Sequence, residues 1–200
     1  KHKFYEGDYM EICVFGAASK IIDEKYITAV EEMGELLAKR GHNLVFGSGC
    51  TGSMGAAARG FKRGGGKTHG VVPNFFKEDL ADFVDWDCDQ MTYTETMRER
   101  KAVMEDLADC FIITPGGAGT FEELFEVLTL KQLGRHRKPI AIYNIDGYYD
   151  KMQDMLDYSI ENGFIKDNCR ALYKFFDRAE DMVEYLEKDD MQGLTIKDLK

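Results

Sequence analysis

Residues 110–123 read CFIITPGGAGTFEE, and this stretch indicates the fold more directly than any other part of the chain. The apolar run 110–114 is typical of a buried strand, and a helix-patterned segment begins directly after the glycines. Glycines let backbone N–H groups approach an anion, and the positive end of a helix favours that anion by about 0.3–1 kcal/mol. The stretch therefore predicts a strand, a turn that holds a phosphate, and a helix, with a phosphorylated small molecule as the ligand.

The same alternation of strand and helix patterns runs through most of the chain. Apolar runs that we expect to be strands lie at 12–15, 44–46, 70–72, 91–93, 110–114, 139–143 and 172–176. Helix-period segments lie at 23–40, 52–63, 95–109, 119–134, 148–162 and 178–187. This order predicts an α/β fold, a three-layer Rossmann-like architecture whose mostly parallel sheet has helices on both faces and binds ligands at its carboxyl ends. We expect residues 1–200 to form one domain, because this length and a hydrophobic content of 44% suffice for a full core.

Composition narrows the functional classes. The chain has 36 acidic and 26 basic residues, a net charge of −10, which argues against nucleic-acid binding because basic surfaces supply most of that affinity. No apolar run reaches the roughly 18 residues of a membrane span. The five cysteines lack the spacing of a disulfide framework or a zinc site. We therefore expect a cytoplasmic protein with no nucleic-acid partner, no membrane partner and no bound metal.

A second glycine-rich stretch, GSGCTG at 47–52, follows the expected strand 44–46 and formally matches the GxGxxG dinucleotide motif. A nicotinamide site also needs an acidic residue about 20 positions later for the ribose hydroxyls, and residues 56–77 contain none. A nicotinamide cofactor is therefore disfavoured. Two interpretations stay open: a tight turn without a ligand, or a helix start that faces a ribose or a phosphate.

The segment MRERK at 97–101 contains two arginines that helical spacing separates. Arg100 shares a face with Val103 and Leu107, so it is expected to point inward, whereas Arg98 is expected at the surface. A buried guanidinium needs an anionic partner. Either a bound nucleotide or Glu123 fits that role, and an internal ion pair with a core carboxylate is the structural alternative.

The expected helix 119–134 offers two interpretations of Glu123. Its predicted buried stripe consists of Phe121, Leu124, Phe125 and Leu128, which leaves Glu122, Glu123 and Glu126 off the core face. Thr120 and Glu123 formally make a capping box, which would stabilise the helix by about 1 kcal/mol. A carboxylate one turn from a phosphate-binding turn can instead lie beside the ribose carbon that carries the base. This placement favours a catalytic Glu123.

These motifs together resemble the LOG ("Lonely guy") family of cytokinin riboside 5′-monophosphate phosphoribohydrolases. The resemblance rests on PGGxGTxxE at 115–123 and MxxRK at 97–101, is supported by the loop 47–55 and by Thr129, and covers about residues 10–187. It implies a Rossmann-like homodimer without a cofactor. The implied reaction is hydrolysis of the N-glycosidic bond of a purine nucleoside 5′-monophosphate, AMP or a cytokinin-type nucleotide, giving free base and ribose 5-phosphate.

The resemblance also implies the roles of individual residues. It makes Arg100 and Glu123 catalytic and places an acidic nucleotide contact near Glu78 or Asp79. With the two glycine-rich stretches, the candidate substrate-binding residues are Gly47, Ser48, Gly49, Ser53, Met54, Gly55, Lys101, Gly116, Gly117, Ala118, Gly119, Thr120, Phe121, Glu122 and Thr129. The chain departs from the family at Arg98, where His is common, and at FGSG (46–49), where a YGGG-like run is common. These departures bear on the preferred base more than on the reaction.

Cleavage of a ribosyl C–N bond builds oxocarbenium character on the sugar, which a nearby carboxylate stabilises. Some family members carry a lysine decarboxylase label, but no sequence feature indicates a pyridoxal-phosphate lysine. The alternative function is a non-catalytic nucleotide or cofactor carrier of the same fold. The carboxylate of Glu123 separates the two, because a carrier has no need of it.

Overall fold

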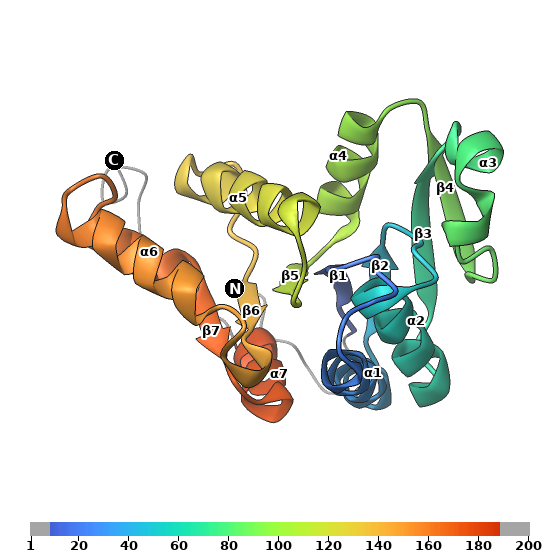
Figure 1. Ribbon diagram of the computed structural model, residues 1–200, viewed down its shortest axis with the longest axis horizontal. Coiled ribbons are helices and arrows are strands. Elements are labelled where there is room, and N and C mark those ends of the chain that lie inside the picture. Colours follow the sequence, from blue (N-terminus) through green and yellow to red (C-terminus); the bar gives the residue numbers. More distant parts are fainter. Residues whose placement is uncertain (1–8, 189–200) are drawn as a thin grey trace.

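The centre of the molecule is a sheet whose seven described strands are all parallel (Figure 1). The structure, a computed structural model, describes residues 9–188 of the 200. The strands are β1 (Glu11–Phe15), β2 (Asn43–Phe46), β3 (Thr68–Pro73), β4 (Gln90–Thr94), β5 (Cys110–Ile113), β6 (Ile140–Tyr143) and β7 (Lys174–Phe176). Their order is β4-β3-β2-β1-β5-β6-β7. The predicted α/β fold is confirmed.

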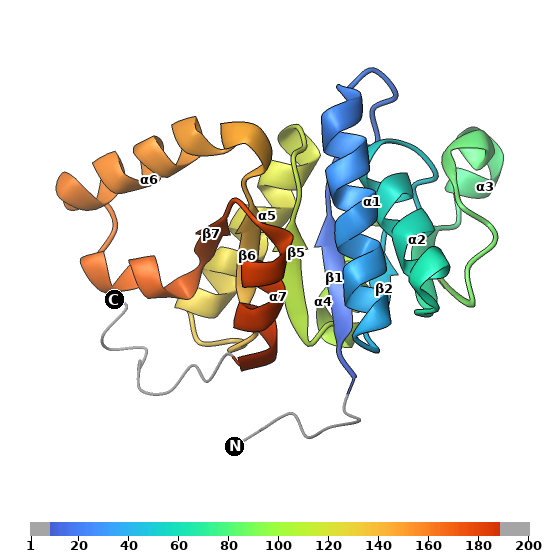
Figure 2. The same cartoon turned by 90° about the horizontal axis from the view of Figure 1, so that it is seen from below.

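Helices cover both faces of this sheet, as Figures 1 and 2 show. One face carries α1 (Glu24–Lys39), α2 (Gly52–Gly64) and α7 (Ala179–Lys188), and the other carries α4 (Met97–Leu107), α5 (Ala118–Gln132) and α6 (Asp150–Glu161). Shorter elements connect them: α3 (Phe76–Asp79) and the 3₁₀ turns η1 (Ala81–Phe83), η2 (Ile145–Gly147) and η3 (Asp167–Leu172).

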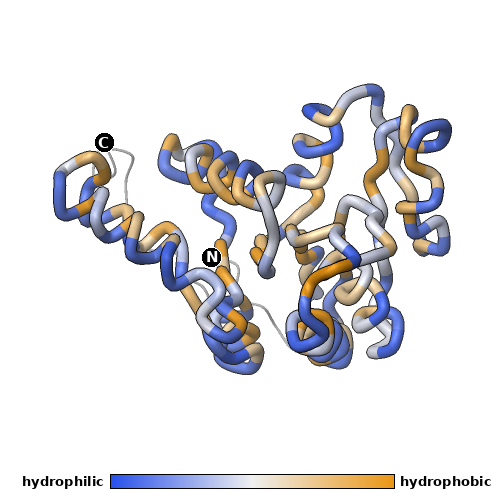
Figure 3. The backbone as a smooth tube through the Cα atoms, viewed as in Figure 1, coloured by the Kyte–Doolittle hydropathy of each residue, from blue (hydrophilic) through white to orange (hydrophobic). Residues whose placement is uncertain are grey.

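Two hydrophobic cores lie on opposite sides of the sheet because successive strand residues point to opposite faces. On β1, Ile12 and Val14 belong to the core under α1, α2 and α7, whereas Cys13 and Phe15 belong to the core under α4 and α5. All four are at most 1% exposed, which is typical of a parallel strand covered on both faces. The hydrophilic segments lie mainly along the outer helices (Figure 3).

The strand order creates the position of the site. The chain passes from β1 outward through β2 and β3 to β4, then returns to the other side of β1 as β5. Neighbouring loops therefore leave β1 and β5 in opposite directions, and ligands of such sheets bind in the crevice at this switch point. The loops that meet there are residues 16–23 after β1 and 114–117 after β5.

The expected strands and helices are all present, with ends shifted by a few residues. Two elements were not predicted, the short helix α3 and the turn η3, because their sequences lack a periodic apolar pattern. Because η3 occupies 167–172, the last strand begins only at Lys174. Within residues 9–188, no helix combines the length and the apolar character that crossing a membrane requires. Residues 1–8 and 189–200 lie outside the described part, so one domain over 1–200 stays a prediction.

Candidate functional site

The turn after β5 and the first three residues of α5, residues 114–120, are together called the phosphate loop below. Protein groups hold three successive carbonyl oxygens of this loop. The Tyr149 hydroxyl donates to the Thr114 oxygen at 2.7 Å, Ser53 Oγ to the Pro115 oxygen at 3.1 Å, and the Tyr148 hydroxyl to the Gly116 oxygen at 2.7 Å. The Ala17 N–H also donates to the Pro115 oxygen, at 3.3 Å. The carbonyl side of the loop is therefore anchored to the protein.

The other side of the phosphate loop is open. Gly117 is the N-cap of α5, and Gly117, Ala118 and Gly119 are exposed. A methyl group built at Gly117 or Gly119 would meet nothing within 4 Å. The first N–H groups of a helix have no partner within the helix, and the helix dipole adds positive charge there. The turn can therefore hold an anion of the size of a phosphate.

The capping-box interpretation of Glu123 is wrong. Because Gly117 is the N-cap, Thr120 lies inside the first turn of α5 and is only 3% exposed. A capping box needs Thr at the N-cap itself. Glu123 is therefore left for another role.

Glu123 lies off the core face of α5, as predicted, and points into the site. Its side chain is 16% exposed, and burial raises its pKa to about 7 even though nearby Arg100 lowers it. The buried face of α5 consists of Thr120, Leu124, Val127 and Lys131. This rotation of the helix turns Glu123 toward α4 and leaves Phe121, predicted to be buried, 37% exposed.

Arg100 is buried opposite Glu123, as predicted, whereas Arg98 is exposed. The Nε of Arg100 donates to the Val71 carbonyl at 3.0 Å, and its Nη2 donates to the Gly47 carbonyl at 2.9 Å. Its Nη1 lies 4.0 Å from Oε1 of Glu123, which is too long for a hydrogen bond. Burial lowers the pKa of Arg100, and the Glu123 carboxylate opposes this effect. Two backbone carbonyls thus fix the guanidinium while its Nη1 edge stays directed toward Glu123.

Gly47 provides the space for this arginine. A methyl group at Gly47 would lie 1.4 Å from Nη2 of Arg100, so any larger residue must displace the guanidinium. The first glycine loop, residues 47–55, therefore contributes to the site by seating a side chain that comes from α4. Sequence reasoning placed both residues in the site but did not connect them.

Most of the first glycine loop packs against protein atoms. Ser48 is fully buried and donates from Oγ to the Asp85 carbonyl at 2.7 Å. A methyl group would lie 2.6 Å from Met54 Cε at Gly49 and 2.2 Å from the Cys50 oxygen at Gly55. Direct ligand contacts stay predictions for Gly47, Ser48, Gly49, Ser53, Met54 and Gly55.

Lys101 and Glu122, both predicted to contact nucleotide, contact each other. Lys101 forms ion pairs with Glu122 and Glu126 that tie α4 to α5. Burial lowers the pKa of Lys101, but hydrogen bonds to the two carboxylates raise it overall. Thr129 is exposed and, at helical spacing, shares the face of Glu122 rather than that of Glu123.

The acidic residues Glu78 and Asp79 lie exposed on α3. Among residues 9–188, no group of three or more His, Cys, Asp or Glu side chains is arranged to hold a metal ion.

Sequence reasoning missed the tyrosines that anchor the phosphate loop. Tyr148 and Tyr149 follow β6, more than 30 positions from the carbonyls they bind. The adjacent letters DGYY at 146–149 indicate only a turn, and no periodic pattern points to the loop.

Comparison with known proteins identifies the family. A family model described as "Possible lysine decarboxylase" matches residues 54–186. Cytokinin riboside 5′-monophosphate phosphoribohydrolase LOG5 of Arabidopsis thaliana is 36% identical over 184 residues, which cover 90% of this chain and 78% of that protein. The enzyme of the same description, LOG, from Oryza sativa subsp. japonica is 36% identical over 90% of this chain and 74% of its own. The chain belongs to the LOG family.

A solved structure similar to this LOG-family chain is that of the molybdenum cofactor carrier protein of Chlamydomonas reinhardtii. Its TM-score is 0.67 at 20% identity, covering 91% of this chain and 100% of that one, which shows the shared fold alone.

The decarboxylase wording of the family model does not match the chemistry of Lys101. A lysine forms a Schiff base through its neutral amine. Lys101 is held as an ammonium by Glu122 and Glu126, and its pKa is raised.

Proposed function

We infer that this protein is a phosphoribohydrolase. It hydrolyses the N-glycosidic bond of a purine nucleoside 5′-monophosphate, AMP or a cytokinin-type nucleotide, and releases free base and ribose 5-phosphate. The observation that carries this inference is the placement of Glu123, whose carboxyl group faces Arg100 one helical turn beyond the open phosphate loop. The names of the LOG-family relatives support the same reaction.

The phosphate loop positions the substrate. The N–H groups at the start of α5 bind the 5′-phosphate, which lies outside the reacting bond. Binding energy from such a remote group fixes the sugar and lowers the entropic part of the barrier. The ribose then spans the distance from the loop to Glu123, so C1′ lies near the carboxylate.

Glu123 and Arg100 carry the chemistry. The C1′–N bond breaks with its electron pair going to the base, which takes up a proton, and a water oxygen bonds to C1′ and loses a proton. The Glu123 carboxylate stabilises the oxocarbenium ion and accepts the proton from water. Arg100 holds the position of Glu123 and favours the departing base through its positive charge.

The raised pKa of Glu123 suits this role. A general base works best when its pKa lies near the working pH, and the pKa of Glu123 is raised to about 7. Below this pH the carboxyl group is protonated and cannot accept the proton from water.

A homodimer is part of the proposal. Apolar side chains are exposed on the two helices beside the site, with Met97 41%, Leu107 37% and Phe121 37% exposed. Such surfaces favour burial against another protein. Light scattering is expected to give twice the monomer mass of 22.8 kDa. We also propose a cytoplasmic location, which agrees with five free thiols because cytosolic conditions keep cysteines reduced.

The decisive experiment incubates the protein with a panel of nucleoside 5′-monophosphates and the matching unphosphorylated nucleosides, and follows free base by chromatography. The expected result is base release from monophosphates, with nucleosides cleaved far more slowly. Nucleotide binding without any base release would instead identify a carrier, the function of the structural relative.

A further inference from the structure

We propose that Tyr148 and Tyr149, called the tyrosine pair, are positioning residues that aim the backbone N–H groups of the phosphate loop at the 5′-phosphate. This inference rests on the proposed function, because it assigns the source of phosphate selectivity in the same site. Neither residue has a part in breaking the glycosidic bond.

The contacts of the pair lie on both sides of Pro115. The Tyr149 hydroxyl donates to the Thr114 carbonyl and the Tyr148 hydroxyl to the Gly116 carbonyl, each at 2.7 Å. In a trans peptide, the C=O and N–H groups of one plane point in opposite directions. The bond from Tyr148 to the Gly116 oxygen therefore turns the N–H of Gly117 away from Tyr148, toward the open side of the loop.

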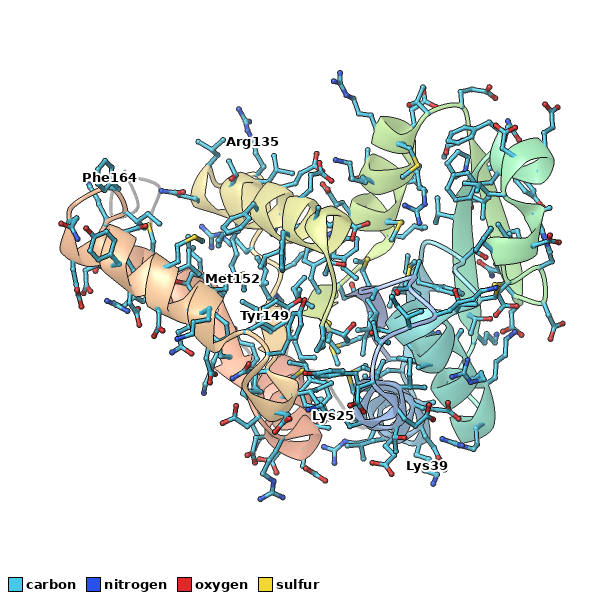
Figure 4. The ribbon with its side chains drawn as sticks, in the orientation of Figure 1. Lys25, Lys39, Arg135, Tyr149, Met152 and Phe164 are labelled. Atoms are coloured by element: carbon cyan, nitrogen blue, oxygen red, sulfur yellow. The ribbon has the colours of Figure 1, made fainter. Side chains whose placement is uncertain are left out.

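The tyrosine pair is itself held rigidly. The Tyr149 N–H donates to Oδ1 of Asn144 at 2.6 Å, and Nδ2 of Asn144 donates to Asp150 at 2.8 Å. The two tyrosine rings meet edge to face with centroids 4.9 Å apart. Figure 4 shows Tyr149 at the start of α6, beside the layer that contains α5. Residues that follow β6, the strand beside β5, therefore fix the position of the phosphate loop.

The two hydroxyls differ in burial, and this difference allows a clean test. Tyr149 is 1% exposed and binds the fully buried Thr114, so losing its hydroxyl leaves a buried carbonyl without a partner. Tyr148 is 39% exposed, so losing its hydroxyl has little effect on folding. Tyr148→Phe therefore separates loop positioning from stability.

The test measures equilibrium binding of AMP and of adenosine, together with turnover of AMP. Tyr148→Phe is expected to weaken AMP binding by about three- to tenfold and to leave adenosine binding and Tm unchanged. KM for AMP rises while kcat changes less. Tyr149→Phe is expected to show the same selective loss together with a lower Tm. Tyr158→Phe on α6, where the ring is 66% exposed, is the control and should match the wild type.

Two results overturn the inference: AMP affinity equal to that of the wild type in Tyr148→Phe, or equal losses of AMP and adenosine affinity. These binding results do not depend on catalysis. A wild-type protein that binds AMP but releases no adenine contradicts the proposed function and leaves the binding comparison valid. A wild type that binds AMP no better than adenosine contradicts the inference directly.

Discussion

The two glycine-rich loops lie at the carboxyl ends of β2 and β5, the strands on either side of β1, yet the space beside their glycines differs. In the first glycine loop, protein atoms fill that space, with Arg100 Nη2 1.4 Å from a methyl group built at Gly47. In the phosphate loop, methyl groups built at Gly117 and Gly119 meet nothing within 4 Å. Glycine thus serves opposite purposes: one loop makes room for the Arg100 side chain, and the other leaves open space where we propose that the phosphate binds. The proposed chemistry lies between Arg100 and the open side of the phosphate loop.

The largest expected effect concerns the carboxylate beyond the open loop. Glu123→Gln is expected to lower base release from AMP about a thousandfold, which corresponds to roughly 4 kcal/mol of barrier, because an amide cannot accept the proton from water. Glu161→Gln is the matched control, since Glu161 is an exposed glutamate on α6, and it should retain most activity. Unchanged turnover in Glu123→Gln would mean that Glu123 does not act as the base.

Loss of the Arg100 side chain is expected to have the next largest effect on turnover. Arg100→Ala should lower turnover about a hundredfold or more, as is typical when a fixed electrostatic group is removed. Arg98→Ala should stay close to the wild type because Arg98 is exposed. Steady-state kinetics of the two variants provide the check. Equal losses would mean that burial does not distinguish the two arginines.

A pair of glycine variants tests the comparison of the loops directly. Gly47→Ala is expected to displace the Arg100 guanidinium, lower turnover toward the Arg100→Ala level and destabilise the fold by about 1–3 kcal/mol. Gly119→Ala should leave stability unchanged or raise it by up to about 1 kcal/mol, because alanine favours a helix. It should raise KM for AMP, since its methyl group enters the open side.

Urea unfolding and AMP kinetics on both variants measure these effects. The comparison fails when Gly119→Ala unfolds as readily as Gly47→Ala, or when Gly47→Ala keeps full activity.

The smallest expected effect is on the pH dependence of stability. The pKa of Glu123 is raised to about 7 in the folded protein from 4.5, so the folded state binds its proton more tightly. Stability from this group is complete below about pH 4.5 and is lost as pH rises through 7. The free energy of unfolding of Glu123→Gln, relative to that of the wild type, should therefore be higher at pH 8 than at pH 5, by on the order of 1–3 kcal/mol.

Unfolding free energies of the wild type and of Glu123→Gln, measured at pH 5 and at pH 8, give this difference. The pKa of Glu105 is also raised to about 7, mainly by burial, but Glu105 is present in both proteins and cancels in the comparison. A stability difference that is the same at both pH values would contradict the raised pKa of Glu123.

The parts of the molecule that could be predicted depend on local pattern. Apolar runs and helical spacing predicted the strands, the phosphate loop and the inward direction of Arg100, because each follows from residues close in the chain. Phe121 was placed wrongly because packing against α4 and the sheet sets the rotation of α5. The seat at Gly47 and the tyrosine pair join residues 53 and more than 30 positions apart, and no local pattern reports such contacts.

The proposed reaction requires that one nucleotide touch both the phosphate loop and Glu123. A crystal structure of the Glu123→Gln variant with AMP tests it most directly, because the substrate should stay intact. We expect the 5′-phosphate on the N–H groups of Gly117, Ala118 and Gly119, with C1′ beside the side chain of residue 123. A phosphate bound elsewhere, or a ribose turned away from residue 123, would contradict it.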